Sequence, residues 1–101
     1  MDETKNISLE LEKYCNEKNA YLFKENIQIS FSIKNRLVEL NKIRLDSGKA
    51  APFARIKKQN NAWDLYFRKG NGWTSPKEFQ EIPSIINALI LIEKDNNNLF
   101  W

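Results

Sequence analysis

The stretch Phe53–Arg68, FARIKKQNNAWDLYFR, decides the fold because it predicts a β-hairpin in one consistent register. A two-residue turn at Asn60-Asn61 brings apolar positions together on one side, in the pairs Ile56–Leu65, Ala54–Phe67 and Lys58–Trp63. The other side then carries an opposite-charge pair and two cation–aromatic pairs: Lys57–Asp64, Arg55–Tyr66 and Phe53–Arg68. Apolarity and charge agree in this register, so a slip by one residue would expose the apolar side to water.

Upstream, strict alternation predicts a second hairpin. Ile27, Ile29, Phe31 and Ile33 share one face, and Lys34-Asn35 offers a tight turn. An even loop would pair Phe31 with Val38, Ile29 with Leu40 and Ser30 with Glu39. The apolar positions then slip to Ile43 and Leu45, which predicts a β-bulge near Asn41-Lys42.

Amphipathic helices flank the two hairpins. Residues 4–18 place Ile7, Leu11, Tyr14 and Cys15 on one face. A second helix starts at Pro83, with an apolar face made of Ile82, Ile85, Ile86, Leu89 and Ile90. The sequence therefore predicts one α+β domain over residues 1–101: an N-terminal helix, a four-stranded antiparallel sheet of two hairpins, and a C-terminal helix. Both helices are expected on one sheet face, as a two-layer sandwich.

The composition of the 101-residue chain excludes several function classes. It contains one cysteine, Cys15, and no histidine, so a Ser-His-Asp arrangement is impossible and no metal or cofactor site is expected. Cys15 sits on the apolar helix face and is interpreted as a small buried hydrophobe. The longest apolar run, Ala88 to Ile92, is far shorter than a membrane span, and Asp2 and Glu3 oppose a secretory signal. We therefore expect a cytoplasmic protein that is not an enzyme.

The charge is uneven along the chain. The net charge is +3, but residues 26–80 carry eleven Lys or Arg and four acids, hence +7. The predicted wet face of the sheet presents Arg55, Lys57, Tyr66 and Arg68, which could hold nucleic acid by phosphate contact and stacking. The alternative is a solvated face of paired charges that keeps the strands soluble.

Bulky apolar residues near the C-terminal end suggest a second surface. Trp73 with Leu99, Phe100 and Trp101 could form a patch that binds a protein partner or closes a homodimer. The alternative is that Trp101 fills a gap in its own core. The function favoured at this point is a non-enzymatic binding or accessory module that acts through protein association, with nucleic-acid binding as the alternative.

The order and spacing of several motifs resemble a known family. These are Ala54-Arg55-Ile56, the run from Trp63 to Phe67, then Trp73, and Asp95 before the final Phe100-Trp101. Together they resemble a small bacterial family known as domain of unknown function 3024, in which Tyr14-Cys15 and the strand around Glu39 also look similar. The resemblance covers nearly the whole chain and implies one compact domain. It implies no activity, cofactor or partner.

Overall fold

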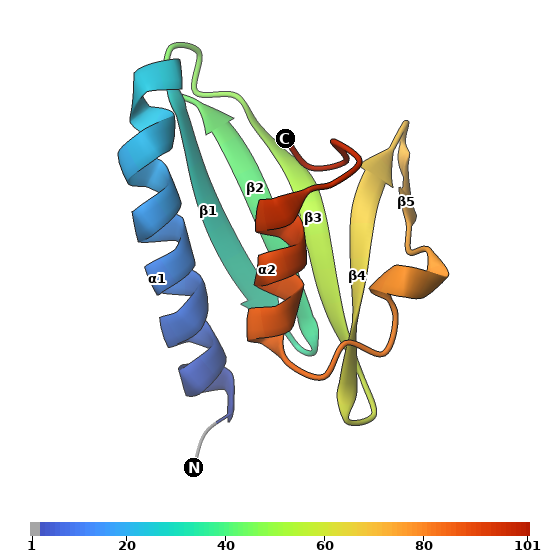
Figure 1. The fold of residues 1–101 in the computed structure, drawn as a ribbon. Helices are drawn as coiled ribbons and strands as arrows, with labels where there is room; N and C mark the ends of the chain where they lie inside the picture. Colours follow the sequence, from blue (N-terminus) through green and yellow to red (C-terminus); the bar gives the residue numbers. More distant parts are fainter. Residues whose placement is uncertain (1–2) are drawn as a thin grey trace.

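The computed structural model describes residues 3–101. Along the chain, a helix lies near each end and the residues between the two helices form a sheet (Figure 1). The first helix, α1, spans Glu3–Leu22 and continues into a short 3-10 helix, η1, at Phe23–Glu25. The second helix, α2, spans Ile85–Lys94, after a 3-10 helix, η2, at Lys77–Phe79. The strands are β1 (Ile27–Lys34), β2 (Leu37–Arg44), β3 (Ala50–Gln59), β4 (Ala62–Lys69) and β5 (Gly72–Thr74).

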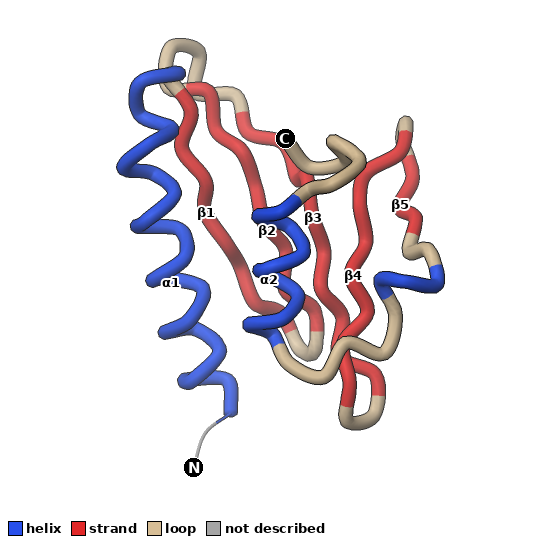
Figure 2. Tube along the Cα trace, viewed as in Figure 1, coloured by secondary structure: helices blue, strands red, loops and turns tan. Residues whose placement is uncertain are grey.

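The sheet has five strands, where the sequence predicted four. Each strand pairs antiparallel with the next, in the order β1-β2-β3-β4-β5 (Figure 2). The additional strand is β5, which follows a turn in which Gly70 adopts a φ of +61°. It pairs with the end of β4 through Arg68 opposite Trp73. Three residues are too few to show a period of two, so the alternation of apolar and polar residues does not reveal this strand.

The central hairpin has the predicted register. Ile56 lies opposite Leu65, Ala54 opposite Phe67, and Lys58 opposite Trp63. Asn60 has a φ of 55° at the turn, a conformation that asparagine tolerates better than most residues. On the other side of the hairpin, Arg55 faces Tyr66 and Lys57 faces Asp64, also as predicted.

The first hairpin has a different register from the one predicted. Ile33 pairs with Val38 and Phe31 with Leu40, so the strands are shifted by two residues. The cause is the turn, which is the two-residue Asn35-Arg36 with Asn35 at a φ of 59°. A shift by two keeps every side chain on its face, and Ile29 therefore still points into the core.

The bulge lies at the predicted level of the sheet but in the neighbouring strand. The β1–β2 pairing is continuous through Asn41 and Lys42, whereas the β2–β3 register shifts between Leu40 and Asn41. The extra residue is Phe53 of β3, which turns inward and is buried, so the predicted pair with Arg68 does not form.

Because the β1–β2 pairing contains no bulge, the apolar residues of β2 beyond Leu40 do not face the core. Ile43 pairs with Gln28, and Leu45 is exposed. The inward position opposite Ile29 is instead occupied by Lys42.

Helix α1 extends one turn beyond its predicted end. Leu22 is buried in this added turn, and Asn26 ends the segment in the left-handed conformation. Asn19, near the end of α1, forms two hydrogen bonds to the backbone of Ile29. Its amide nitrogen donates to the carbonyl oxygen, and its oxygen accepts from the backbone N–H at 2.7 Å. These bonds tie α1 to strand β1.

Helix α2 begins after Ser84, whose hydroxyl accepts a hydrogen bond from the backbone N–H of Asn87. Its buried stripe is rotated from the predicted one. Ile86 and Ile90 are 47% and 44% exposed, while Ala88 and Ile92 are fully buried. Small Ala88 lets the helix approach the sheet on that side, which turns Ile86 and Ile90 toward solvent.

One hydrophobic core joins the apolar faces of both helices to alternate residues of the strands. Its fully buried members include Leu11 of α1, Ile92 of α2, and Leu40, Ile56 and Leu65 of the sheet. Cys15 belongs to this core as a free, buried thiol, in agreement with the interpretation from the sequence. Within residues 3–101, no helix is long and apolar enough to cross a membrane.

Candidate functional site

The polar side of the sheet gathers the four residues that the sequence assigned to a nucleic-acid face. Arg55 and Lys57 lie on β3, and Tyr66 and Arg68 on β4, all on the side opposite the buried strand residues. The register of β5 adds Trp73, which lies directly opposite Arg68. We call the side that carries these five residues the outer face.

Trp73 organises the outer face by holding two guanidinium groups. The Cζ atom of Arg55 lies 4.3 Å from the centre of the Trp73 ring, and that of Arg68 lies 5.3 Å from it. Arg55 reaches this ring from β3 across the whole of β4, and its Nε donates to a Glu39 carboxylate oxygen at 2.9 Å. Arg68 donates from Nε to the carbonyl oxygen of Gly70 at 3.1 Å. Both arginines are thus restrained, which lowers the entropy cost of using their remaining donors.

Positive charge on the outer face is only partly neutralised. Glu39 is paired with Arg55, but Arg68 forms no ion pair with any residue in the described part of the chain. Lys57 and Asp64 are register partners, yet they form no ion pair there either. An oxygen of Asp64 instead accepts the backbone N–H of Glu81, at 3.1 Å. The charges of Lys57 and Arg68 therefore remain available to an anionic ligand.

The residues of the second predicted surface do not lie together. Trp73 is on the outer face, whereas Phe100 is 3% exposed and belongs to the core on the other side of the sheet. Leu99 packs partly buried against the same core. Trp101 packs against Phe53 with ring centres 5.1 Å apart, and its indole N–H donates to the carbonyl oxygen of Ile92 at 3.0 Å.

Asp95 holds this C-terminal segment in place. It follows α2 in the left-handed conformation, and its carboxylate accepts the backbone N–H groups of Leu99 at 2.6 Å, Phe100 at 3.1 Å and Trp101 at 2.8 Å. A single carboxylate thus satisfies three consecutive donors and closes the turn. In the sequence, Asp95 stood out only as one of the residues that carry the family resemblance.

Lys42 and Lys18 flank the Trp101 ring. The Lys42 Nζ lies 4.8 Å from the ring centres of both Phe53 and Trp101, and it donates to the carbonyl oxygen of Phe100. Burial lowers the pKa of Lys42, and the negative charge of Asp95 opposes this effect. The Lys18 Nζ lies 4.6 Å from the Trp101 ring. Trp101 is therefore fixed by cation–π contacts on its own chain.

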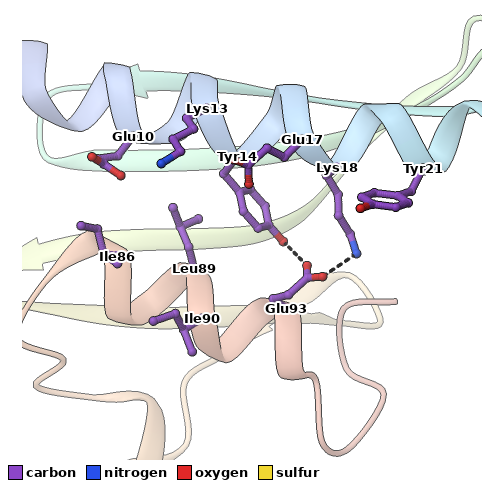
Figure 3. Close-up of a pocket in the computed structure, with 10 residues that line it drawn as sticks. All are labelled: Glu10, Lys13, Tyr14, Glu17, Lys18, Tyr21, Ile86, Leu89, Ile90 and Glu93. Atoms are coloured by element: carbon purple, nitrogen blue, oxygen red, sulfur yellow. Dashed lines mark hydrogen bonds and ion pairs between the residues drawn. The ribbon is translucent and has the colours of Figure 1, made fainter.

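A groove of about 320 Å³ runs between α1 and α2 (Figure 3). Glu93 reaches across it from α2, accepting a hydrogen bond from the Tyr14 hydroxyl at 3.1 Å and pairing with Lys18 at 3.0 Å. Burial and the nearby Glu93 carboxylate raise the pKa of Tyr14 well above its ordinary value. These bonds link the two helices. The side chains of Tyr14, Lys18 and Glu93 thus interact with one another within the chain.

The outer face contains two residues that the sequence interpretation left out of the site, Trp73 and Glu39. A signal for Trp73 was present, since a two-residue turn at Gly70-Asn71 places Arg68 opposite Trp73 by the reasoning used for the central hairpin. The predicted register placed Glu39 opposite Ser30, but the observed register places it between Ser32 and Arg55. In residues 3–101, no three His, Cys, Asp or Glu side chains are placed to hold a metal ion.

The fold and the outer face define a small α+β domain with an antiparallel five-stranded sheet and a basic, tryptophan-centred polar side. The family described as Domain of unknown function (DUF3024) matches residues 1–101, and the chain belongs to this family. No curated protein matches the chain, and no solved structure matches it.

Proposed function

We propose that this domain is a non-enzymatic binding module that holds single-stranded nucleic acid on the outer face of its sheet. The observation that carries the proposal is the Arg55–Trp73–Arg68 stack, which sets two restrained guanidinium groups beside an indole on a polar sheet side. The proposal relies on the two-layer arrangement predicted from the sequence, in which helices cover one sheet face and leave the other open.

Two features of the outer face suit a single strand. Lys57 and Arg68 are exposed and lack carboxylate partners among the described residues, so they can contact phosphates without first breaking an ion pair. Tyr66 and Trp73 are half-buried aromatic rings on adjacent strands, where unstacked bases can pack against them or against the arginine planes. A duplex hides its bases and offers such rings nothing to stack on, so we expect preference for single strands.

The test is a fluorescence-anisotropy titration of the full chain with labelled single-stranded DNA, single-stranded RNA and duplex DNA of equal length. We expect tighter binding to the single strands and an affinity that falls steeply as salt rises from about 50 to about 200 mM. Arg68→Ala removes one phosphate contact, so it should weaken binding similarly across sequences. It should also reduce the slope of the logarithm of the binding constant against the logarithm of the salt concentration by about one.

Arg44→Ala is the matched control for this variant. It removes the same charge from an exposed arginine at the end of β2, which is not part of the outer face and has only a loose pair with Asp46 at 3.7 Å. Equal losses in the Arg68 and Arg44 variants would mean nonspecific charge attraction and would refute the outer face as the site. Absence of binding to all three probes at low salt would refute the proposed function itself.

Protein association, which the sequence favoured over nucleic-acid binding, stays a prediction. The C-terminal aromatic residues are engaged by Asp95, Lys42 and Phe53 of their own chain, so the support for a patch of Trp73, Leu99, Phe100 and Trp101 is weaker than the support for the outer face.

A further inference from the structure

We infer that the exposed side of α1 is a self-association surface that holds a second copy of this chain as a symmetric, antiparallel helix pair. The surface is a ridge of side chains spaced four residues apart: Leu9, Lys13, Glu17 and Tyr21. Ridges of this spacing interlock in the commonest class of helix packing. The inference goes beyond nucleic-acid binding, because the ridge lies on the helical side of the molecule and not on the outer face.

The ends of this ridge are large apolar side chains in water. Leu9 is 56% exposed and Tyr21 is 75% exposed, although both lie within a regular helix. Helix α1 runs along one edge of the molecule, beside β1 (Figure 1). A single exposed leucine would need no explanation. Here two such residues lie twelve positions apart on one ridge, about 18 Å along the helix axis, with two charges between them.

The middle of the ridge carries one positive and one negative charge. Lys13 and Glu17 are both exposed, and neither forms an ion pair with another residue of the described chain. Within one helix, a lysine four residues before a glutamate is the less favourable order for pairing. Both charges therefore remain available to a partner.

The order of residues along the ridge is complementary to itself when reversed. In an antiparallel pair with a two-fold axis between Lys13 and Glu17, Leu9 meets Tyr21 of the second copy and Lys13 meets Glu17 of the second copy. Each contact then occurs twice, as an isologous interface requires. Lys5 continues the same row toward the start of α1, and Glu25, which lies beyond the end of α1 in η1, carries the opposite charge. A second copy supplies this reversed pattern by symmetry alone, which is why we commit to it as the occupant.

A contact along one helix is small, so we expect a weak dimer with a dissociation constant in the micromolar range or above. Two exposed ion pairs at its centre make its formation sensitive to salt. Helix α1 contacts the sheet through its opposite, buried side, so this pairing leaves the outer face accessible in both copies.

The test is sedimentation equilibrium of the full chain from low micromolar to near-millimolar concentration, at low and high salt. We expect a monomer–dimer equilibrium that weakens with salt. Lys13→Glu alone, or Glu17→Lys alone, brings like charges together at both symmetric contacts and should raise the dissociation constant at least tenfold. An equimolar mixture of these two variant chains restores opposite charges at both contacts, so it should form a heterodimer although neither variant dimerises by itself.

Matched controls separate this interface from a general effect of charge. Lys24→Glu and Glu12→Lys make the same charge changes at exposed positions outside the ridge and should leave the dissociation constant unchanged. Circular dichroism of every variant checks that α1 is retained. A wild-type chain that is monomeric at all concentrations would overturn the inference. A dimer that persists in both ridge variants would overturn it too, because the contact would then lie elsewhere.

Discussion

The guanidinium carbon of Arg55 lies 4.3 Å from the centre of the Trp73 ring, although the two residues belong to strands separated by β4. The contact ties the three-residue strand β5 to the centre of the sheet. Glu39 of β2 accepts a hydrogen bond from the same arginine, and Arg68 of β4 contacts the same ring. One chain of contacts therefore joins four of the five strands, from β2 to β5. Loss of this ring should therefore be felt in stability as well as in binding.

Trp73→Ala should lower the free energy of unfolding by about 1–3 kcal/mol, because it removes two cation–π contacts and the half-buried indole. Trp73→Phe keeps a ring with a weaker attraction for cations and should lose less. Urea denaturation of the three proteins gives the comparison. Equal stability of the alanine variant and the wild type would mean that the ring contributes nothing to holding β5.

Asp95→Ala should release the C-terminal segment and lower the free energy of unfolding by about 2–4 kcal/mol, because three backbone N–H groups lose a charged acceptor. Asp95→Asn is the conservative control, since asparagine keeps one acceptor oxygen and tolerates the φ of 39° at this position. We expect it to lose distinctly less. Urea denaturation measures stability. Acrylamide quenching of tryptophan fluorescence, compared in a Trp73→Phe background to reduce the signal of the other exposed indole, reports exposure of Trp101 because Trp63 is buried. Unchanged quenching in the alanine variant would contradict an anchoring role for Asp95.

Stability should fall in alkaline solution through Cys15. Burial raises the pKa of the Cys15 thiol from 9.0 to about 11, so the folded chain keeps a proton that the unfolded chain releases. The protonated thiol contributes fully to the free energy of unfolding below pH 9.0. This contribution is lost as pH rises toward about 11, at up to about 1.4 kcal/mol per pH unit. Cys15→Ala lacks this titration but retains the others. The stability difference between wild type and variant, measured by urea denaturation at several pH values, should therefore shrink across this window. A constant difference would contradict the raised pKa.

Local patterns in the sequence were sufficient for both helices, for four of the five strands and for most of the face assignments. The structure confirms the register predicted for the central hairpin, in which Arg55 lies opposite Tyr66. This register could be predicted because it alone places apolar residues opposite apolar residues on one side of the hairpin and opposite charges together on the other. The first hairpin was predicted with a register wrong by two residues. Its side chains alternate equally well in both registers, and the turn at Asn35-Arg36 decides between them.

The bulge illustrates the limit of reading one strand at a time. The break in apolar pattern after Leu40 was assigned to β2, but the extra residue is Phe53 in β3. A bulge belongs to a pair of strands, so the pattern of one strand cannot say which of the two carries it. The consequence is large, because the bulge turns Phe53 inward to pack against Trp101.

The sequence by itself determined the α+β class, the buried face of α1 and the central hairpin, because periods of 3.6 and 2 reflect local geometry that nearby residues set. Only the tertiary structure decided that Trp73 joins Arg55 and Arg68 on the outer face, and that Trp101 meets Lys18, Lys42 and Phe53. These contacts join segments far apart in the chain. They depend on the turns that set the registers, on which strand carries the inserted residue and on the path after Asp95, and the pattern of a single segment decides none of these.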